Sequence, residues 1–412
     1  MHRILTRCGA PAPDGVSCDT TTVLGQVSWL LASTTVELAI TRTGGMMAPV
    51  KFFPSDPTPI APYHVAPWAE EEVPPDSPPM LAALRGDWFC SAFGENKERY
   101  AQRSESISTK LQPHGDTANG AWQLIGRDQC DAGAWVQLGI DLPLQGGRCE
   151  SVTALLPDHS VIYQRHDLSG LTGPINPGHH ATLQLPDDQA SGHFSCSPLV
   201  HAQTCFEPID GPGSSPHSCL RPNVDIVDLG KVPTVDGLAA DLRYYPARRG
   251  FDDLIILCAD PSLALAWAAL TFPKKGFVWF ALRSPRLLAS TLLWFSNGGR
   301  RFAPWNGRHF NVMGIEDVTA YFHAGLALSA RENPLNKQGV RTCLEPDGEG
   351  CLSIPYIQGV ARIPNGFDRL AAIEPLPEKR SIRLRSYSGL MCEVSCDLDF
   401  LRRGRLHGLE MP

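Results

Sequence analysis

The sequence predicts a mainly β protein made of large antiparallel sheets with few short helices. Many short segments rich in β-branched and aromatic residues follow one another along the 412-residue chain. Gly, Pro, Asn and Asp separate these segments, and long amphipathic helical patterns are scarce. Strands that recur at such short spacing favour a sandwich or a barrel over alternating strand and helix units. We therefore expect a large β-sandwich.

The strand candidates are short apolar runs bounded by turn residues. In chain order they cover residues 36–40, 134–142, 149–156, 160–168, 181–185, 253–259, 263–272, 277–282, 287–296 and 381–389. Pro273 and Gly276 join two successive candidates, which predicts a hairpin at that point. In the last candidate Ile382 and Leu384 alternate with arginines, which is typical of a strand with one buried face.

Residues 54–79 form a proline-rich segment with nine prolines and three consecutive glutamates. Proline lacks the backbone N–H and is excluded from helix interiors and central strands, so we expect an extended segment. We interpret it as an insertion that covers the edge of one sheet; a linker between domains and a partner-binding proline motif are the alternatives. The resulting domain organisation is an N-terminal extension over residues 1–22 and a single β-sandwich domain over residues 23–412.

The composition argues against charged macromolecules as partners. The net charge is -7 and no basic run occurs, so we expect neither nucleic acid nor a membrane surface as a partner. Residues 23–40 are apolar, but polar side chains interrupt them too often for a membrane span. The first residues bring prolines and an aspartate in place of the apolar core of a signal peptide, which predicts a cytoplasmic protein. Thirteen scattered cysteines, an odd number, predict reduced thiols.

Residues 178–186, "GHHATLQLP", contain two adjacent histidines and then alternate polar and apolar side chains. In a strand, successive side chains point to opposite faces, so His180 would share a polar face with Thr182 and Gln184. His179 would then point the opposite way or belong to the preceding turn. Because adjacent strand histidines diverge, this pair does not predict a metal site, and we expect no metal and no other cofactor. A metal site among the histidines of residues 166–193 is the alternative.

Three segments combine a histidine or a carboxylate with glycine and an aromatic residue. "PHGDTANGAW" carries His114, "GHHATLQLP" carries His180, and "WNGRHFNVMGIEDVT" carries Glu316. Taken singly, each has an ordinary explanation: a turn, a strand start and a solvated loop. Their order along the chain, after the early "TGGMMAPVKF", is more informative. This order resembles the aldose 1-epimerase, or galactose mutarotase-like, superfamily.

The resemblance implies a mutarotase-like β-supersandwich and the roles of three residues. Members of this family have an early Gly-Gly strand, a His-Gly segment leading to Trp, an Asn-His segment running into a strand, and a late Glu. In this sequence His179 stands where the family has asparagine. By resemblance, Glu316 is the base that takes the proton of an anomeric hydroxyl, His180 is the acid that protonates the ring oxygen, and His114 donates a hydrogen bond to the sugar.

The sequence also departs from the family pattern. The family's glutamate usually lies nearer the chain end after a leucine, and Glu345 in "TCLEPDGEG" fits that wording as well. We favour Glu316, because the residues after Glu345 resemble an exposed turn. The family's sugar-binding arginine has no clear counterpart, and Arg99 is one candidate.

Four residues are candidates for substrate binding. An aromatic face can pack against the CH surface of a sugar, and polar groups can bind its hydroxyls. The candidates are Trp305, Asn306, Arg308 and His179. The resemblance implies an isomerase of the aldose 1-epimerase type that acts on a free sugar or sugar derivative, and we expect a monomer or a homodimer. A non-catalytic carbohydrate-binding or regulatory protein on the same fold is the alternative.

Overall fold

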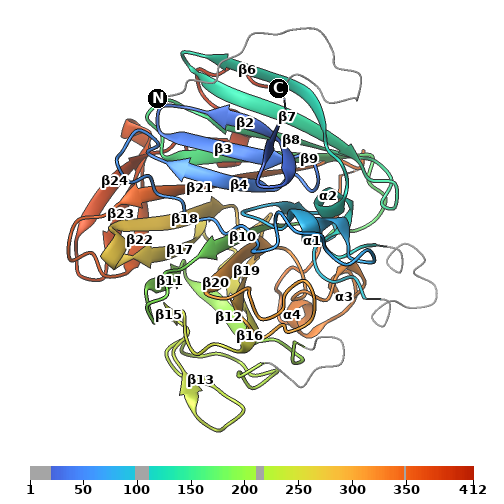
Figure 1. Cartoon of the computed structure of the whole chain (residues 1–412), viewed down its shortest axis with the longest axis vertical. Helices are drawn as coiled ribbons and strands as arrows, with labels where there is room; N and C mark the ends of the chain where they lie inside the picture. Colours follow the sequence, from blue (N-terminus) through green and yellow to red (C-terminus); the bar gives the residue numbers. More distant parts are fainter. Residues whose placement is uncertain (1–19, 98–110, 210–217, 348) are drawn as a thin grey trace.

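The computed structural model describes residues 20–97, 111–209, 218–347 and 349–412. Antiparallel sheets dominate the molecule, and only short helices accompany them (Figure 1). The prediction of a mainly β fold with large antiparallel sheets is therefore confirmed. None of the helices in these ranges is long and apolar enough to cross a membrane. Most of the predicted N-terminal extension and Arg99 lie outside the described residues.

Two large sheets carry most of the strands. The nine-stranded sheet has the order β15 (Tyr244–Tyr245), β11 (Gly192–Cys196), β17 (Ala266–Phe272), β18 (Phe277–Arg283), β21 (Leu352–Arg362), β9 (Val161–Ser169), β8 (Arg148–Leu155), β7 (Gly133–Asp141) and β6 (Gln123–Cys130). The six-stranded sheet has the order β12 (Leu199–Thr204), β16 (Phe251–Ala259), β19 (Ser290–Asn297), β20 (Val312–Val318), β10 (Gly178–Gln184) and β5 (Phe89–Cys90).

Smaller sheets and short helices complete the described fold. A four-stranded sheet contains β1 (Thr21–Val23), β2 (Gln26–Ala32), β3 (Val36–Thr41) and β4 (Met47–Phe52); a three-stranded sheet contains β22 (Leu370–Leu376), β23 (Ser381–Ser386) and β24 (Met391–Ser395); and β13 (Val232–Pro233) pairs with β14 (Ala239–Ala240). The helices are α1 (Pro79–Ala83), α2 (Gly115–Asn119), η2 (Pro273–Lys275), α3 (Leu326–Ser329), α4 (Pro334–Lys337), η3 (Pro377–Lys379) and α5 (Phe400–Arg403).

The predicted hairpin is present between β17 and β18. Phe272 and Phe277 are paired at its closed end, and the short helix η2 makes the turn. Pro273 fits the first position of η2 because its fixed φ suits a helical turn and its missing N–H is not needed there. Gly276 ends the turn at a φ of 71°, in the left-handed region that glycine adopts without a steric penalty. The local sequence therefore determines this connection.

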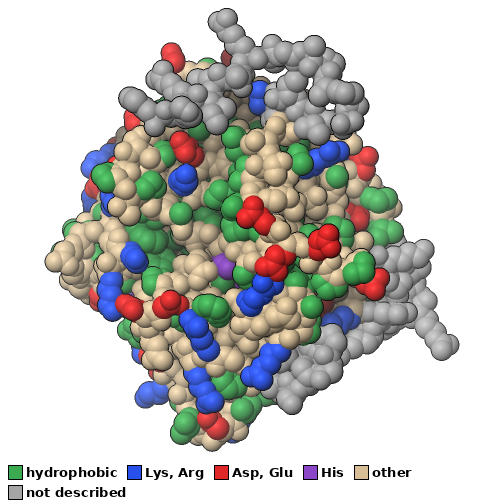
Figure 2. Space-filling view, viewed as in Figure 1, with side chains coloured by type: hydrophobic (Ala, Val, Ile, Leu, Met, Phe, Trp, Pro, Cys, Tyr) green, Lys and Arg blue, Asp and Glu red, His purple; other side chains and the backbone are tan. Residues whose placement is uncertain are grey.

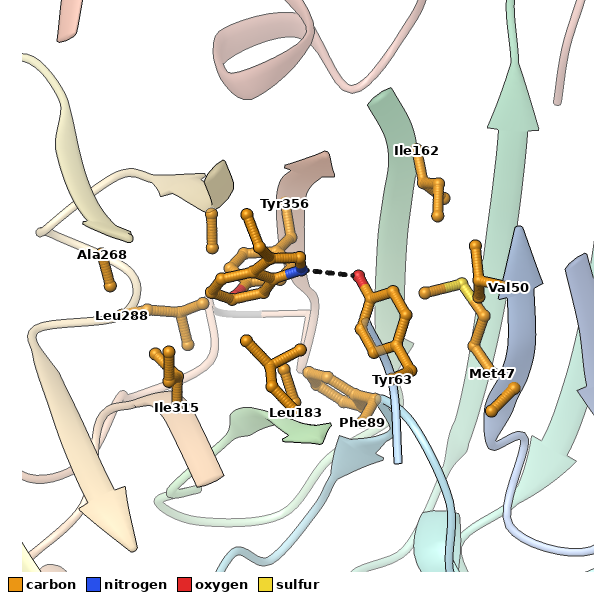
Figure 3. Close-up of a cluster of buried hydrophobic side chains, with 14 of the residues drawn as sticks. Met47, Val50, Tyr63, Phe89, Ile162, Leu183, Ala268, Leu288, Ile315 and Tyr356 are labelled. Carbon is orange, nitrogen blue, oxygen red and sulfur yellow. Dashed lines mark hydrogen bonds between the residues drawn. The ribbon is translucent and has the colours of Figure 1, made fainter. Parts of the chain in front are cut away.

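The main core lies between the two large sheets. Leu183 and Ile315 come from the six-stranded sheet, and Trp279 and Tyr356 come from the nine-stranded sheet. Figure 3 shows these apolar side chains around Tyr63, whose hydroxyl accepts a hydrogen bond of 3.0 Å from the Trp279 indole N–H. Burial of a phenol and an indole is tolerated here because their polar atoms bond each other.

The proline-rich segment lies along the edge of β10. The His64 N–H donates to the Thr182 carbonyl over 2.9 Å, and the Gln184 N–H donates to the Pro62 carbonyl over 2.8 Å. An isolated bridge between Tyr63 and Leu183 lies within the same antiparallel pairing. The segment thus bonds to the part of β10 that lies beyond the two-residue β5, and it brings the His64 side chain to the outer face of the six-stranded sheet.

Candidate functional site

His180 and Glu316 contact each other on the outer face of the six-stranded sheet. They are directly paired residues of the neighbouring strands β10 and β20. Ala181 and Leu183 on β10 point into the main core, so His180 projects from the opposite face, as the alternation predicts. His180 Nε2 lies 3.2 Å from Glu316 Oε1. The structure therefore brings together the acid and the base that the sequence suggests.

Both members of this pair are nearly excluded from solvent, with 4% of His180 and 2% of Glu316 exposed. The Trp88 ring stacks on the His180 ring with a centroid distance of 4.0 Å and an interplanar angle of 18°. Burial raises the pKa of Glu316 to about 8, although the charge of Arg300 opposes this rise. Burial, assisted by His114, lowers the pKa of His180 well below 6.5.

These two shifts determine where the proton resides at neutral pH. Both shifts have the same physical cause, because a water-poor site disfavours the carboxylate and the imidazolium alike. At neutral pH we therefore expect a protonated Glu316 carboxyl in contact with the neutral imidazole of His180. The pair holds one proton, and that proton can be transferred across the 3.2 Å contact between the two side chains.

His114 lies beside this pair at the start of α2. Its ring centroid is 5.0 Å from that of His180. A Cβ at Gly115 would lie 1.8 Å from the Ser91 carbonyl oxygen, so only glycine allows the His-Gly segment to approach β5 this closely. His114 Nδ1 accepts a hydrogen bond of 3.4 Å from the Gly94 N–H, which assigns the proton to Nε2. Burial lowers the pKa of His114 to about 3, so its ring is a neutral donor.

An aromatic cluster with one guanidinium extends the site away from His180. Trp294, on β19, lies 6.0 Å from His180 between ring centroids. The Arg300 guanidinium carbon lies 4.9 Å from the Trp294 ring centroid and 4.7 Å from that of Trp305. Arg300 Nε also lies 3.4 Å from a carboxylate oxygen of the buried Asp252. Trp305, a predicted sugar platform, therefore belongs to the cluster next to the His180–Glu316 pair, where it is buried.

Two further imidazoles in this cluster have an unsatisfied nitrogen. His309 stacks on Trp294 at 5.2 Å, and its Nδ1 lies 2.7 Å from the Ser296 hydroxyl. His64 Nδ1 donates to Gln184 Oε1 over 2.6 Å. The buried Nε2 atoms of both rings, and Nδ1 of His180, have no hydrogen-bond partner among the described residues. Buried polar atoms are normally paired, so these nitrogens mark positions that a polar ligand could satisfy.

Three predicted substrate-binding residues do not join this cluster. His179 projects from the core face of β10, is fully buried, and lies 3.0 Å from Asp87 between His179 Nδ1 and Asp87 Oδ2. Asn306 is exposed in a turn with a φ of 46°. Arg308 makes two hydrogen bonds, of 2.7 and 2.9 Å, to the exposed Glu71 of the proline-rich segment. The alternation of side chains along β10 explains why His179 points into the core. The ion pair with Glu71, which comes from a distant segment, explains the position of Arg308.

The structure also distinguishes the two candidate bases. Glu316 contacts His180, whereas Glu345 is exposed next to the turn that its sequence suggests. The histidines considered as metal ligands do not gather around one point: His166 lies 5.0 Å from His179 between ring centroids and stacks on Phe89, whereas His193 bonds the Asp368 carbonyl. Within the described ranges, no three His, Cys, Asp or Glu side chains are grouped so that they could hold one metal ion.

Sequence reasoning missed Arg300, His309 and His64. Arg300 and His309 belong to the stretch of glycine, arginine and aromatic residues that precedes Glu316, so the density of that stretch was the available signal. No local signal identifies His64, because its place in the site depends on the pairing of the proline-rich segment with β10.

Comparison with solved structures places this architecture among known folds. A candidate aldose 1-epimerase from Escherichia coli K12 matches with a TM-score of 0.53 and 11% identity, over 82% of this chain and 100% of that chain. A galactose mutarotase-like protein from Clostridium acetobutylicum matches with a TM-score of 0.52 and 11% identity, over 84% of this chain and 98% of that chain. A galactose mutarotase related enzyme from Lactobacillus acidophilus matches with a TM-score of 0.50 and 11% identity, over 82% of this chain and 99% of that chain.

These likenesses establish the fold. The chain has the galactose mutarotase-like fold, and the predicted resemblance is confirmed at that level. No protein-family model matches the sequence, and no curated protein matches it in sequence. Since fold alone does not determine chemistry, the function must be argued from the site.

Proposed function

We propose that this protein binds a free sugar or sugar derivative beside His180 and Glu316 and interconverts its anomers. The observation that carries this proposal is the direct contact of an imidazole and a carboxyl group on paired strands, next to buried nitrogens without partners. An aldose 1-epimerase needs one group that takes a proton and one that gives a proton within reach of the same sugar. The fold, shared with mutarotase-like proteins, supports the same reading.

In this mechanism the pair keeps a total of one proton. Hydroxyl groups of a bound sugar replace some of the solvation that burial removes, and they favour the charged form with Glu316 as carboxylate and His180 as imidazolium. The carboxylate takes the proton of the anomeric hydroxyl, while the imidazolium gives its proton to the ring oxygen. The bond between the anomeric carbon and the ring oxygen breaks and leaves an open-chain aldehyde. Rotation about the adjacent carbon–carbon bond and the reverse proton transfers then close the ring on the other face.

The neighbouring residues supply binding and orientation. His114 Nε2–H is a neutral donor for a sugar oxygen, because its Nδ1 is already engaged. The Nε2 atoms of His64 and His309 are acceptors for sugar hydroxyls. His64 Nδ1 donates to Gln184, and His309 Nδ1 donates to the Ser296 hydroxyl, which itself donates to Asp252. Trp305 offers an aromatic face. The cytoplasmic location and the monomeric or homodimeric state stay predictions.

A second candidate function is carbohydrate binding without catalysis. The observation that favours it is the burial of the pair, with only 4% of His180 and 2% of Glu316 exposed. Histidine contributes only a small purple area to the face drawn in Figure 2, and His180 is among the five histidines that are buried in the described residues. Catalysis would require the surrounding side chains to move apart and admit the sugar.

The first test is direct measurement of anomer equilibration. Polarimetry or NMR would follow pure anomers of galactose, glucose and a sugar phosphate with the wild type, His180→Ala and Glu345→Ala. We expect the wild type to accelerate equilibration of at least one sugar and His180→Ala to lose roughly a hundredfold in rate, because the proton donor to the ring oxygen is gone. Glu345→Ala is the matched control, since this carboxylate is exposed, and should leave the rate unchanged.

Two results would contradict the proposal in different ways. Sugar binding by the wild type without faster equilibration would favour the non-catalytic protein. Acceleration that survives His180→Ala unchanged would mean that the catalytic groups lie elsewhere.

The pH dependence of kcat/KM is a second prediction. The singly protonated pair is the active form, and the raised pKa of Glu316, about 8, belongs to the loss of its one proton. We therefore expect kcat/KM, corrected for the uncatalysed reaction, to fall about tenfold per pH unit above pH 8. The opposing limb should lie well below pH 6.5, where His180 takes a second proton. A profile that instead rises through pH 8 would exclude a one-proton mechanism.

A further inference from the structure

Two adjacent rungs of the six-stranded sheet carry four polar residues with opposite orientations. On β10 and β20, His180 is paired with Glu316, and His179 is paired with Asp317. Since successive side chains of a strand point to opposite faces, the first rung serves the outer site and the second rung faces the main core. Any change of register or tilt in the core rung is therefore transmitted to the site rung, one residue away.

Tyr356 contacts both members of the core rung at once. It comes from β21 of the opposite, nine-stranded sheet and is fully buried. Its ring stacks on the His179 ring with a centroid distance of 4.0 Å and an angle of 16°. Its hydroxyl donates to Asp317 Oδ2 over 2.9 Å. One side chain thus links β10 and β20 from behind, and Figure 3 shows Tyr356 inside the apolar core.

The same network reaches the segment that carries Trp88. His179 Nδ1 lies 3.0 Å from Asp87 Oδ2, and Gln358 of β21 donates to the same oxygen over 2.7 Å. Asp87 and Trp88 are consecutive and point to opposite faces, and Trp88 stacks on His180. The contacts in the core therefore fix the positions of β10, β20 and the segment that contains Asp87 and Trp88 relative to one another.

Such a network permits few alternative arrangements. Asp317 also accepts a hydrogen bond of 2.6 Å from the Thr291 hydroxyl and lies 2.8 Å from the Arg283 guanidinium. In a water-free interior, each of these polar groups is strongly disfavoured unless all its partners are in place. A shift of one residue would also exchange the faces of His179 and His180.

We propose that the buried network of Asp87, His179, Tyr356 and Asp317 is a positioning device that holds His180 against Glu316 on the other face of the sheet. Tyr356 is its central positioning residue. It is not a catalytic residue, because it lies behind the sheet and cannot touch a sugar bound in front of it. The kinetic part of this inference rests on the proposed function, whereas the geometric part does not.

The test compares Tyr356→Phe with Tyr163→Phe. The first change keeps the ring and its stacking and removes only the hydroxyl that bonds Asp317. Tyr163 is a matched control, because it is equally buried and its hydroxyl accepts a hydrogen bond of 2.8 Å from the Asp397 N–H. Tyr163 lies on β9, where it is paired with Ile357, the residue after Tyr356. Its side chain belongs to the core on the other side of the nine-stranded sheet.

Two readouts are needed. With a sugar that the wild type turns over, we expect Tyr356→Phe to lower kcat about tenfold with little change in KM, because misplacement of acid and base affects the reaction more than binding. Tyr163→Phe should keep the wild-type kcat. The second readout is the ¹⁵N NMR spectrum of the histidine rings, in which the His180 signals report its contact with Glu316 and need no activity. Tyr356→Phe should move these signals, and Tyr163→Phe should leave them in place.

The two proposals can therefore fail separately. A wild type without activity, in which Tyr356→Phe still moves the His180 signals, would contradict the proposed function and support the positioning device. Wild-type kcat and unmoved His180 signals in Tyr356→Phe would overturn the positioning device and leave the proposed function intact.

Discussion

Replacing Glu316 by glutamine is expected to stabilise the protein near pH 8 and to remove anomer interconversion. Burial raises the pKa of Glu316 from 4.5 to about 8 in the folded protein. Between these two values the carboxyl is ionised in the unfolded chain and neutral in the fold. The favourable contribution of the neutral form is complete below pH 4.5 and is lost as the pH rises toward 8. The wild type should therefore lose roughly 1.4 kcal/mol of unfolding free energy per pH unit through this one group.

Glutamine removes this dependence and keeps the local contact. Its amide N–H can donate to His180 Nε2, which lies 3.2 Å from the carboxyl oxygen that the amide replaces. Chemical denaturation at pH 5 and pH 8 should show the free energy of unfolding of Glu316→Gln rising relative to the wild type by about 3 kcal/mol. Glu345→Gln is the control, because an exposed carboxylate should give no such trend. A constant difference between wild type and Glu316→Gln at both pH values would contradict the raised pKa.

The same substitution should lower kcat about a thousandfold, because an amide cannot take the proton of the anomeric hydroxyl. A gain of stability together with a loss of turnover is the pattern expected where a fold tolerates an unfavourable group for its chemistry. Loss of turnover together with loss of stability at both pH values would instead mean that Glu316 is mainly a structural residue.

Local patterns were sufficient to predict much of this fold. The turn between β17 and β18 follows from Pro273 and Gly276, whose backbone preferences act over a few residues. The alternation along β10 determines to which side of the sheet His180 points, because the opposite face of that strand is apolar. The order of the strands in the sheets could not be read in this way, since β10 is paired with β20, which lies more than a hundred residues later.

The candidate site was predictable to the extent that it depends on single strands. The choice between Glu316 and Glu345 needed the pairing of β10 with β20, which places only Glu316 beside His180. Arg308 looks like a sugar-binding residue in sequence, but the fold places it within reach of Glu71 in the proline-rich segment. His64 shows the opposite case, since long-range pairing brings an unremarkable residue into the site. Contacts between distant segments, which no local pattern encodes, account for each of these differences.

The core network behind the site has an energetic cost that a substitution should expose. The Arg283 guanidinium lies 2.8 Å from Asp317, and the side chains are 2% and 0% exposed. Its Nε also donates to the Leu288 carbonyl over 2.9 Å. Two opposite charges buried in this way compensate each other, so the pair contributes less to stability than its geometry suggests. Removal of one partner is different, because it leaves the other charge without compensation in a medium that solvates it poorly.

Arg283→Met is therefore expected to lower the free energy of unfolding by about 3 to 5 kcal/mol, since it leaves the Asp317 carboxylate unpaired inside the protein. Methionine keeps much of the volume of the arginine side chain, so the loss should reflect charge more than a cavity. Chemical denaturation at neutral pH measures this change. Arg403→Met is the control, because Arg403 contacts Asp399 at 3.5 Å with both side chains more than half exposed, and water replaces such a partner at little cost. Equal and small losses in both variants would mean that water reaches Asp317, and the reverse face of the site would then be less rigid than its hydrogen bonds imply.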